Sequence, residues 1–234
     1  MTSFPNARWI RALTAQVRYA RARGPPNATA FFCDLGRGLG EIPVLVTCGH
    51  VGQGEDVAYF EPGRLGDRPH PALAVPCDSS RWLHHPTEDL AVVPLTRSEV
   101  RTWGRDGWAH VPWLTIGAGP PRPGTTVVVA GFPDGLTAYG SGLATLRAGR
   151  VLPPHAGSGP GEFEVWASVA PGSSGSPVLW LSGDDWHLAG ILNSGPRAAA
   201  HGHAPEGEDD PLPATCVSAS NLEWFRQVLA LHQA

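Results

Sequence analysis

The sequence predicts an all-β fold, and three observations support this prediction. The 234 residues include 29 glycines and 24 prolines, which is typical of many short strands joined by turns rather than of a helical bundle. Hydrophobic residues make up 42% of the chain and charged residues 16%, ordinary values for a protein with a packed core. Short apolar runs bounded by glycine, proline or polar residues recur along the chain. We expect one large or two small domains.

The first segment, residues 1–27, is expected to form a basic amphipathic helix followed by a linker. Four apolar residues have the spacing of one helical face: Trp9, Ile10, Leu13 and Val17. Five arginines accompany them: Arg8, Arg11, Arg18, Arg21 and Arg23. One interpretation is a helix packed on the β domain with a solvated basic face. The other is a docking helix for an acidic regulatory protein, a nucleic acid or a membrane surface.

Apolar runs predict the strands. In the first half, from residue 28 to about 116, they cover 29–34, 44–47, 57–60, 72–75 and 90–95. In the second half, from 124 to about 220, they cover 125–130, 142–151, 162–166, 177–180, 187–193 and 214–218. The Gly- and Pro-rich stretch 117–124 has the composition of a crossover between the halves. Residues 221–232 predict a closing helix.

Two polar residues stand at the ends of predicted buried strands. His50 ends a stretch that begins with the apolar run 42–46, so its imidazole is expected at a strand end. Asp89 comes directly before the run 90–95. A carboxylate at the entrance of a buried strand needs a partner, and His50 is the candidate.

A serine further along the chain completes the pattern of a nucleophilic hydrolase. Ser174 lies between Gly172 and Gly175, which let the backbone take a tight turn whose N–H groups can converge on a developing oxyanion. A serine hydroxyl is a poor nucleophile at neutral pH, so an imidazole must take its proton and a carboxylate must orient that imidazole. His50, Asp89 and Ser174, in that chain order, meet these needs.

At these residues the chain resembles the chymotrypsin-like (trypsin-fold) serine proteases, in particular the small bacterial trypsin-like group that includes the HtrA proteases. Residues 47–50 (Thr-Cys-Gly-His) are similar to that family's Thr-Ala-Gly-His, and residues 89–91 (Asp-Leu-Ala) to its Asp-Leu-Ala. Residues 172–177 (Gly-Ser-Ser-Gly-Ser-Pro) are similar to its Gly-Asn-Ser-Gly-Ser-Pro. The resemblance implies two six-stranded antiparallel β-barrels of the chymotrypsin-like type within a protease domain at 28–234: barrel 1 at about 28–116 and barrel 2 at about 124–220.

The resemblance implies a serine endopeptidase that hydrolyses a protein or peptide substrate through an acyl-enzyme. His50 would be the base, Asp89 its orienting acid and Ser174 the nucleophile, with the oxyanion hole at the N–H groups of Gly172 and Ser174. Ser173 stands where digestive relatives carry an aspartate that binds a newly cleaved N-terminus. We therefore expect an enzyme that is active without N-terminal cleavage or that is controlled by a partner. We also expect it to be a processing enzyme of a bacterial stress or defence pathway.

The specificity pocket implied by the resemblance has Ser168 at its base, six residues before the nucleophile. The other pocket residues are Asn193, Ser194 and Gly195 along one wall, and Ala214. Because Ser168 carries no charge, we expect a hydrophobic or small uncharged side chain before the scissile bond, with a basic one as the alternative. The loop 196–213 is expected to be a solvated acidic insertion. The alternative interpretation is that its acidic residues attract basic substrates.

Two other functions fit parts of the pattern. A binding or scaffold module on a protease fold, with weak or vestigial cleavage, is compatible because the identity of three residues does not establish their geometry. An esterase shares the three residue types. Its usual Gly-x-Ser-x-Gly elbow is not met, because Ser176 stands two residues after Ser174.

The composition limits which partners and which cellular locations we expect. The net charge of −4 shows no general bias toward polyanions, and we expect no nucleic-acid partner. Lysine is absent, so all 17 basic side chains are arginine. Neither a signal-peptide pattern nor an apolar stretch of 18 residues is present, so we expect neither export nor a membrane span.

The four cysteines favour a reduced, cytoplasmic protein. They are Cys33, Cys48, Cys77 and Cys216. Val51 occupies the place where the resembled family has the cysteine of its disulfide after the histidine. A Cys33–Cys48 pair across neighbouring strands is the alternative. No cofactor is expected, and residues 201–203 (His-Gly-His) are too irregularly placed to predict a metal site.

Overall fold

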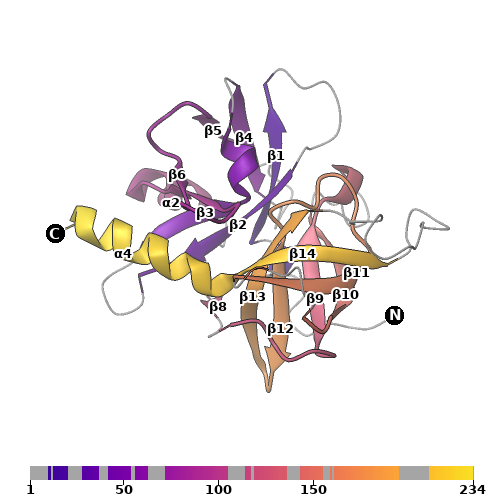
Figure 1. Ribbon diagram of the computed structural model, residues 1–234. Coiled ribbons are helices and arrows are strands. Elements are labelled where there is room, and N and C mark those ends of the chain that lie inside the picture. Colours follow the sequence, from indigo (N-terminus) through magenta and orange to yellow (C-terminus); the bar gives the residue numbers. More distant parts are fainter. Residues whose placement is uncertain are drawn as a thin grey trace.

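Two antiparallel sheets make up the computed structural model of the chain, one from each half of the sequence (Figure 1). The structure describes residues 10–11, 13–20, 28–36, 42–53, 56–62, 72–104, 114–116, 119–135, 143–154, 159, 161–194 and 211–233. Among these residues, no helix combines the length and the apolar character needed to cross a bilayer.

The first sheet is an open half-barrel of seven strands in the order β5-β4-β1-β2-β3-β7-β6. Their bounds are β1 Thr14–Tyr19, β2 Ala28–Asp34, β3 Pro43–Thr47, β4 Val57–Pro62, β5 Leu73–Pro76, β6 Leu83–His84 and β7 Ala91–Pro94. Within the described part of the chain the end strands β5 and β6 do not pair with each other. The prediction of a closed six-stranded barrel here is therefore wrong: closure needs both edges to pair, and β6 has only two residues.

Strand β1 contradicts the predicted N-terminal helix. It lies between two neighbours, with Gln16 opposite Thr29 of β2 and Val17 opposite Phe60 of β4. Four consecutive residues, Thr14 to Val17, are buried, whereas four consecutive residues of a helix would point to all of its sides, the solvated one included. Pairing on both sides overrides the helical spacing of the apolar residues. Ile10 and Arg11 are helical, but most of the proposed docking surface, residues 1–9 and 21–27, lies outside the described residues.

The second sheet closes into a six-stranded barrel. Its order is β12-β9-β10-β11-β14-β13-β8, and the additional pairing of β12 with β13 closes it. The bounds are β8 Thr115–Ile116, β9 Thr126–Gly131, β10 Thr145–Val151, β11 Glu162–Ala167, β12 Pro177–Ser182, β13 Asp185–Ser194 and β14 Leu212–Ser218. All six strands predicted for this half are present, and β8 adds to the outside of β13 as a parallel partner.

Short helices connect and brace the sheets. They are the 3₁₀ turns η1 (Gly49–Gly52), η3 (Pro133–Gly135) and η5 (Ala219–Asn221), and the α-helices α2 (Arg97–Gly104) and α4 (Leu222–Gln233). The predicted C-terminal helix is thus confirmed as α4, which leaves the second barrel and extends across to the first sheet (Figure 1). Leu222 and Phe225 are fully buried and belong to the same apolar cluster as Leu90 of the first half.

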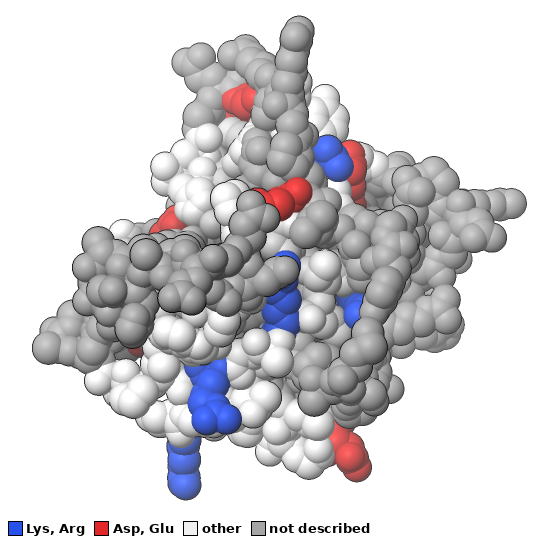
Figure 2. Space-filling view, turned by 90° about the vertical axis from the view of Figure 1, so that its right-hand side faces the viewer, with Lys and Arg blue, Asp and Glu red and all other residues white. Residues whose placement is uncertain are grey.

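Charged side chains are scattered on the face drawn in Figure 2. Arginines and acidic residues both occur there, and among the described residues neither sign gathers into one broad patch. This distribution agrees with the small net charge and gives no support to a polyanion-binding surface on that face.

Candidate active site

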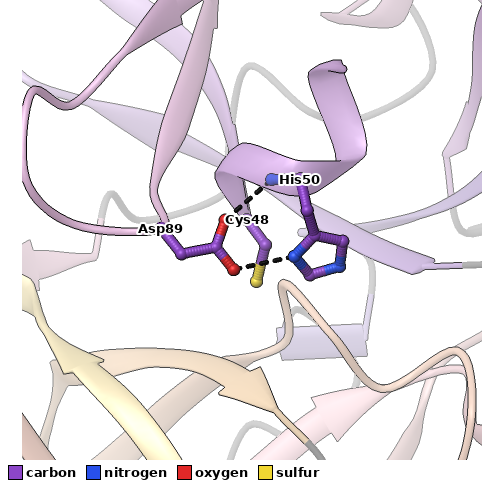
Figure 3. Close-up of side chains that lie close together, drawn as sticks. All are labelled: Cys48, His50 and Asp89. Atoms are coloured by element: carbon purple, nitrogen blue, oxygen red, sulfur yellow. Dashed lines mark hydrogen bonds and ion pairs between the residues drawn. The ribbon is translucent and has the colours of Figure 1, made fainter. Parts of the chain in front are cut away.

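Two predicted site residues lie in direct contact in the first half of the molecule. His50, in η1 after β3, brings Nδ1 to 2.7 Å from Oδ2 of Asp89, which stands before β7 (Figure 3). The backbone N–H of His50 donates to Oδ1 of the same carboxylate at 2.7 Å. Because a carboxylate only accepts, Nδ1 is the protonated nitrogen, and Nε2 is left as the acceptor that a general base requires.

The surroundings keep Asp89 ionised. Burial raises the pKa of this carboxyl, but the hydrogen bonds and charge of His50 and the backbone N–H of Gly49 lower it more, so the pKa lies below its ordinary value. Gly49 is required for this grip, since a Cβ there would stand 2.8 Å from Asp89 Oδ1. The carboxylate thus orients the imidazole while carrying a negative charge.

A hollow of about 310 Å³ opens beside this pair. Its lining residues are Gly49, Gln53, His84, His85, Pro86, Thr87, Glu88 and Asp89. The Asp89 side chain remains 31% exposed and that of His50 48%. The imidazole is therefore accessible to a substrate.

The loop that carries Ser174 is fixed by its carbonyl groups. The carbonyl of Pro171 accepts from the N–H of Asp134 at 2.6 Å, and that of Gly172 accepts from the Thr29 hydroxyl at 2.8 Å. The carbonyl of Ser173 accepts from the N–H of Ser176 at 3.0 Å, and that of Ser174 from the N–H of Thr29 at 2.7 Å. Every carbonyl from 171 to 174 is thus turned toward the protein.

Two N–H groups of the same loop have no acceptor among the described residues, those of Gly172 and Ser174. In a trans peptide the C=O and N–H point in opposite directions. Because Asp134 holds the Pro171 carbonyl, the N–H of Gly172 points away from Asp134. Two unused backbone donors flanking a serine are what oxyanion stabilisation requires.

The Ser174 hydroxyl also has no hydrogen bond to any described residue. Its side chain is half-buried. Gly175, directly after it, has φ +86°, and a Cβ there would lie 1.9 Å from the carbonyl oxygen of Thr29 and 2.4 Å from Oγ1 of Thr47. The loop that carries Ser174 therefore reaches the first sheet at the strands next to His50.

Thr29 joins the two halves at this point. It lies on β2, is fully buried and makes two bonds to the loop, one from its N–H and one from its hydroxyl. Its hydroxyl oxygen also accepts from the N–H of Phe132 at 3.2 Å, and its carbonyl accepts from the Thr47 hydroxyl at 2.8 Å. The sequence analysis missed this residue, because a threonine in an apolar strand carries no local sign of a contact 143 residues away.

Ser173 closes the loop on itself. Its hydroxyl accepts from the N–H of Ala170 at 3.3 Å, and its own N–H donates to the carbonyl of Ala170 at 3.0 Å. The side chain is 4% exposed. A neutral residue thus holds the position where the resembled digestive enzymes use a charged aspartate.

Cys48 lies beside the histidine–aspartate pair but is suited to packing rather than to chemistry (Figure 3). Its buried thiol donates to the carbonyl of Leu192 in β13 at 3.1 Å. Burial, followed by the charge of Asp89, raises the pKa of this thiol well above its ordinary value. Ligand atoms of Cys48, His50 and Asp89 lie within 4.8 Å of one another. Metal binding there would require a thiolate and compete with the His50–Asp89 bond, so the group fits a metal poorly.

The residues predicted for the specificity pocket are spread over three segments. Ser168 directly follows β11 and is half-buried. Asn193 lies near the end of β13, where the register with β14 shifts, and Ala214 is buried in β14 opposite Val165. Ser194 ends β13, and Gly195 lies outside the described residues, as do residues 196–210 of the predicted acidic loop.

The structure adds a charged residue to this region that the sequence analysis did not identify. The Arg147 guanidinium on β10 donates to the Ser168 hydroxyl. Arg147 is 21 residues from Ser168. β10 carries a second arginine, Arg150, so no local signal in the sequence distinguished which of the two would contact Ser168.

The fold and these contacts define the class of chymotrypsin-like peptidases, and comparisons with known proteins agree. Residues 28–191 match the family described as trypsin-like peptidase domain, and the chain belongs to this family. No curated protein matches the chain.

Solved structures of the same fold include two groups of peptidases. Kallikrein-related peptidase 10 is similar with a TM-score of 0.60 and 18% sequence identity, covering 96% of this chain and 98% of that one. The active form of the Rv3671c protease from M. tuberculosis is similar with a TM-score of 0.53 and 20% identity, covering 94% of this chain and 82% of that one. An inactive form of the same protease is similar with a TM-score of 0.54 and 18% identity, covering 96% of this chain and 92% of that one.

Proposed function

We propose that this chain is a serine endopeptidase with His50 as general base, Asp89 as the residue that orients it, and Ser174 as nucleophile. The observation that carries the proposal is the two-point contact of Asp89 with His50, at 2.7 Å to both the ring and the backbone nitrogen. That contact fixes the tautomer in which Nε2 can take a proton from an attacking hydroxyl.

The proposed reaction is acyl transfer. Ser174 Oγ attacks the peptide carbonyl carbon as its proton passes to His50 Nε2, and the carbonyl oxygen becomes an oxyanion. The N–H groups of Gly172 and Ser174, which have no acceptor in the described part of the chain, would donate to it. His50 then gives its proton to the leaving amine. Water then attacks the acyl carbon as His50 takes its proton, and the ester bond to Ser174 Oγ breaks. The products are free Ser174 and a new carboxylate.

The setting of this activity is also a proposal. A processing enzyme for one protein substrate, in a bacterial stress or defence pathway and in the reducing cytoplasm, would suit the four free cysteines.

A binding module with vestigial cleavage is the second candidate. The observation in its favour is that the Ser174 hydroxyl bonds to none of the described residues, His50 included. Catalytic hydrogen bonds are often long without substrate and tighten in the Michaelis complex, so this geometry is compatible with both functions.

Covalent labelling with a fluorophosphonate probe separates the two. We expect the full chain to be labelled at one serine, and Ser174→Ala to abolish labelling and to lower kcat/KM for peptide hydrolysis by at least about 10⁴-fold. Ser182→Ala, on an exposed serine of β12, is the matched control and should react as the wild type does. If the probe does not label the wild type, and thermal unfolding shows that the wild type is folded, the binding module is favoured.

A further inference from the structure

The hollow beside the His50–Asp89 pair has a mostly polar lining. Its volume of about 310 Å³ lies at the lower end of the range found for ligand pockets, which suits a single side chain rather than a larger ligand. Of the residues that line it, only Pro86 has an apolar side chain. An apolar occupant would take the polar groups out of water without giving them hydrogen-bond partners. The hollow therefore favours a polar or charged occupant.

The charge of the lining is negative. Two carboxylates line the hollow, those of Glu88 and Asp89, and none of the described arginines does. Nδ1 of His85 accepts from the N–H groups of Thr87 and Glu88, at 3.4 and 3.1 Å, so this nitrogen carries no proton and the ring is neutral. A cation that enters the hollow thus meets two acids and no arginine that competes for them.

Glu88 is the carboxylate that remains available to a ligand. Asp89 is bound twice by His50, at its ring and at its backbone nitrogen. Glu88 accepts at Oε1 from the hydroxyl of its neighbour Thr87, at 3.2 Å, and none of the ion pairs in the described part of the chain includes it. The side chain is half-buried. A carboxylate with unused acceptor positions suits the ammonium group of lysine or the guanidinium group of arginine.

Glu88 also lies where the two halves of the molecule meet. A Cβ at Gly161, directly before β11 of the second half, would stand 3.3 Å from Oε1 of Glu88. A substrate that reaches both His50 of the first half and Ser174 of the second has to lie across this junction. Glu88 is therefore within the region that such a substrate passes.

The direction of side chains along an extended substrate indicates which residue enters the hollow. Under the proposed function, the side chain immediately before the scissile bond enters the pocket with Ser168 at its base, in the second half. Successive side chains of an extended chain point to opposite sides. The side chain two residues before the scissile bond therefore points toward the first half, where His50 and the hollow lie.

We propose that Glu88 makes this peptidase selective for a basic side chain, arginine or lysine, two residues before the scissile bond. The inference rests on the proposed function, which places the scissile bond between His50 and Ser174. The substrate cation binds the Glu88 carboxylate, and the side-chain oxygens of Gln53 and Thr87 can accept from its remaining N–H donors. The hollow excludes part of the water that would screen the pair, so the attraction exceeds that of an exposed ion pair.

Matched peptides test the selectivity. The substrates differ only two residues before the scissile bond, where they carry arginine, its uncharged analogue citrulline, or glutamate. We expect the full chain to have a kcat/KM for the arginine peptide about fivefold or more above that for the citrulline peptide. Glu88→Gln should bring this ratio close to one, and Glu88→Lys should favour the glutamate peptide. Equal values for arginine and citrulline, or a ratio that survives in Glu88→Gln, would overturn the proposal.

Asp184→Asn is the matched control for the change in net charge. Asp184 is exposed in the turn between β12 and β13 and does not line the hollow. Its substitution removes one negative charge, as Glu88→Gln does, but should keep the wild-type ratio of the arginine and citrulline peptides. A ratio that falls equally in both variants would mean that net charge, and not Glu88, sets the preference.

Binding to an inactivated protein keeps this test separate from the proposed function. Peptides with a free C-terminal carboxylate and with arginine or citrulline as the penultimate residue are titrated into Ser174→Ala by calorimetry, with and without Glu88→Gln. Tighter binding of the arginine peptide that disappears in the double variant supports the inference even if the wild type cleaves nothing, which would refute only the proposed function. Equal binding of the two peptides, or no binding of the arginine peptide, refutes the inference even if the wild type is an active peptidase.

Discussion

At the scale of the residue, Thr29 shapes a loop that is formed elsewhere in the chain. Its N–H and hydroxyl hold the carbonyls of Ser174 and Gly172, at 2.7 and 2.8 Å. These bonds fix the peptide groups 172–173 and 174–175, which are chain neighbours of the peptide groups that carry the N–H of Gly172 and the N–H of Ser174. Together with the neutral Ala170–Ser173 turn, they provide an anchor for the loop that requires no buried charge.

Replacing Thr29 by valine tests this role. Valine keeps the shape but removes the hydroxyl, which leaves the Gly172 carbonyl buried without that donor. We expect kcat to fall about tenfold while KM changes little, because the lost contact acts on the transition state rather than on substrate binding. Steady-state kinetics on one peptide substrate measures both constants.

Thr29→Ser is the control for that substitution. Serine restores the hydroxyl without the methyl group, so kcat should return toward the wild-type value. If both variants lose activity equally, or if KM alone rises, Thr29 contributes packing and not loop orientation. Thermal unfolding of both proteins shows whether the fold is retained.

At the scale of the element, the turn before Asp89 depends on helix α4. His85 packs edge-on against Trp224 and Phe225 of this helix, with ring centroids 5.2 and 5.8 Å away. Its Nδ1 accepts from the N–H of Glu88 at 3.1 Å and from that of Thr87 at 3.4 Å. The last helix of the chain thus supports the turn that delivers the aspartate of the first half.

The pH dependence of stability tests this arrangement. Burial lowers the pKa of His85, partly opposed by the charge of Glu88. Its folded pKa is below the unfolded value of 6.5, so the contribution of neutral His85 is complete above that pH and is lost as the pH falls toward the folded value. We expect the unfolding temperature at pH 7 to drop by about 2–4 °C in His85→Ala, a difference that shrinks on acidification.

Two variants complete that experiment. His85→Asn keeps a side-chain acceptor for the turn without a titrating ring, so it should retain more stability than the alanine at pH 7. His84→Asn, at the exposed neighbouring position, should leave the pH profile unchanged. A gap between wild type and His85→Ala that widens as the pH falls would contradict the interpretation.

At the scale of the whole molecule, contacts between the halves assemble the candidate site. Besides the Thr29 bonds, the buried thiol of Cys48 in the first half donates to the Leu192 carbonyl in the second. All four cysteines are free and buried. Noncovalent packing, and not a disulfide, therefore connects the two halves.

Thiol titration with Ellman's reagent checks this picture. We expect almost no reaction of the folded protein within minutes, because the thiols are buried and burial raises the pKa values of Cys48, Cys77 and Cys216. In denaturant four thiols should react. Fewer than four after unfolding would mean that a disulfide exists, and a fast native reaction would mean that a cysteine is more accessible than the fold shows.

The sequence predicted most strands and the contact between His50 and Asp89, because both depend on local signals. An apolar run flanked by turn residues identifies a strand wherever it lies, and His50 and Asp89 stood at the ends of such runs. The N-terminal helix was predicted wrongly because Thr14–Tyr19 gain partners on both sides only in the folded sheet. The closed first barrel was wrong because strand count does not reveal whether the edges meet.

What the sequence determined by itself was the all-β character, the order of the chemical groups and the glycines that let the serine loop turn. Only the tertiary structure decided which distant residues touch them: Thr29 on the loop carbonyls, His85 under α4, and Arg147 on Ser168. The physical reason is that strand periodicity is written in neighbouring residues, whereas hydrogen bonds between strands join positions that are far apart in the chain and leave no regular spacing behind.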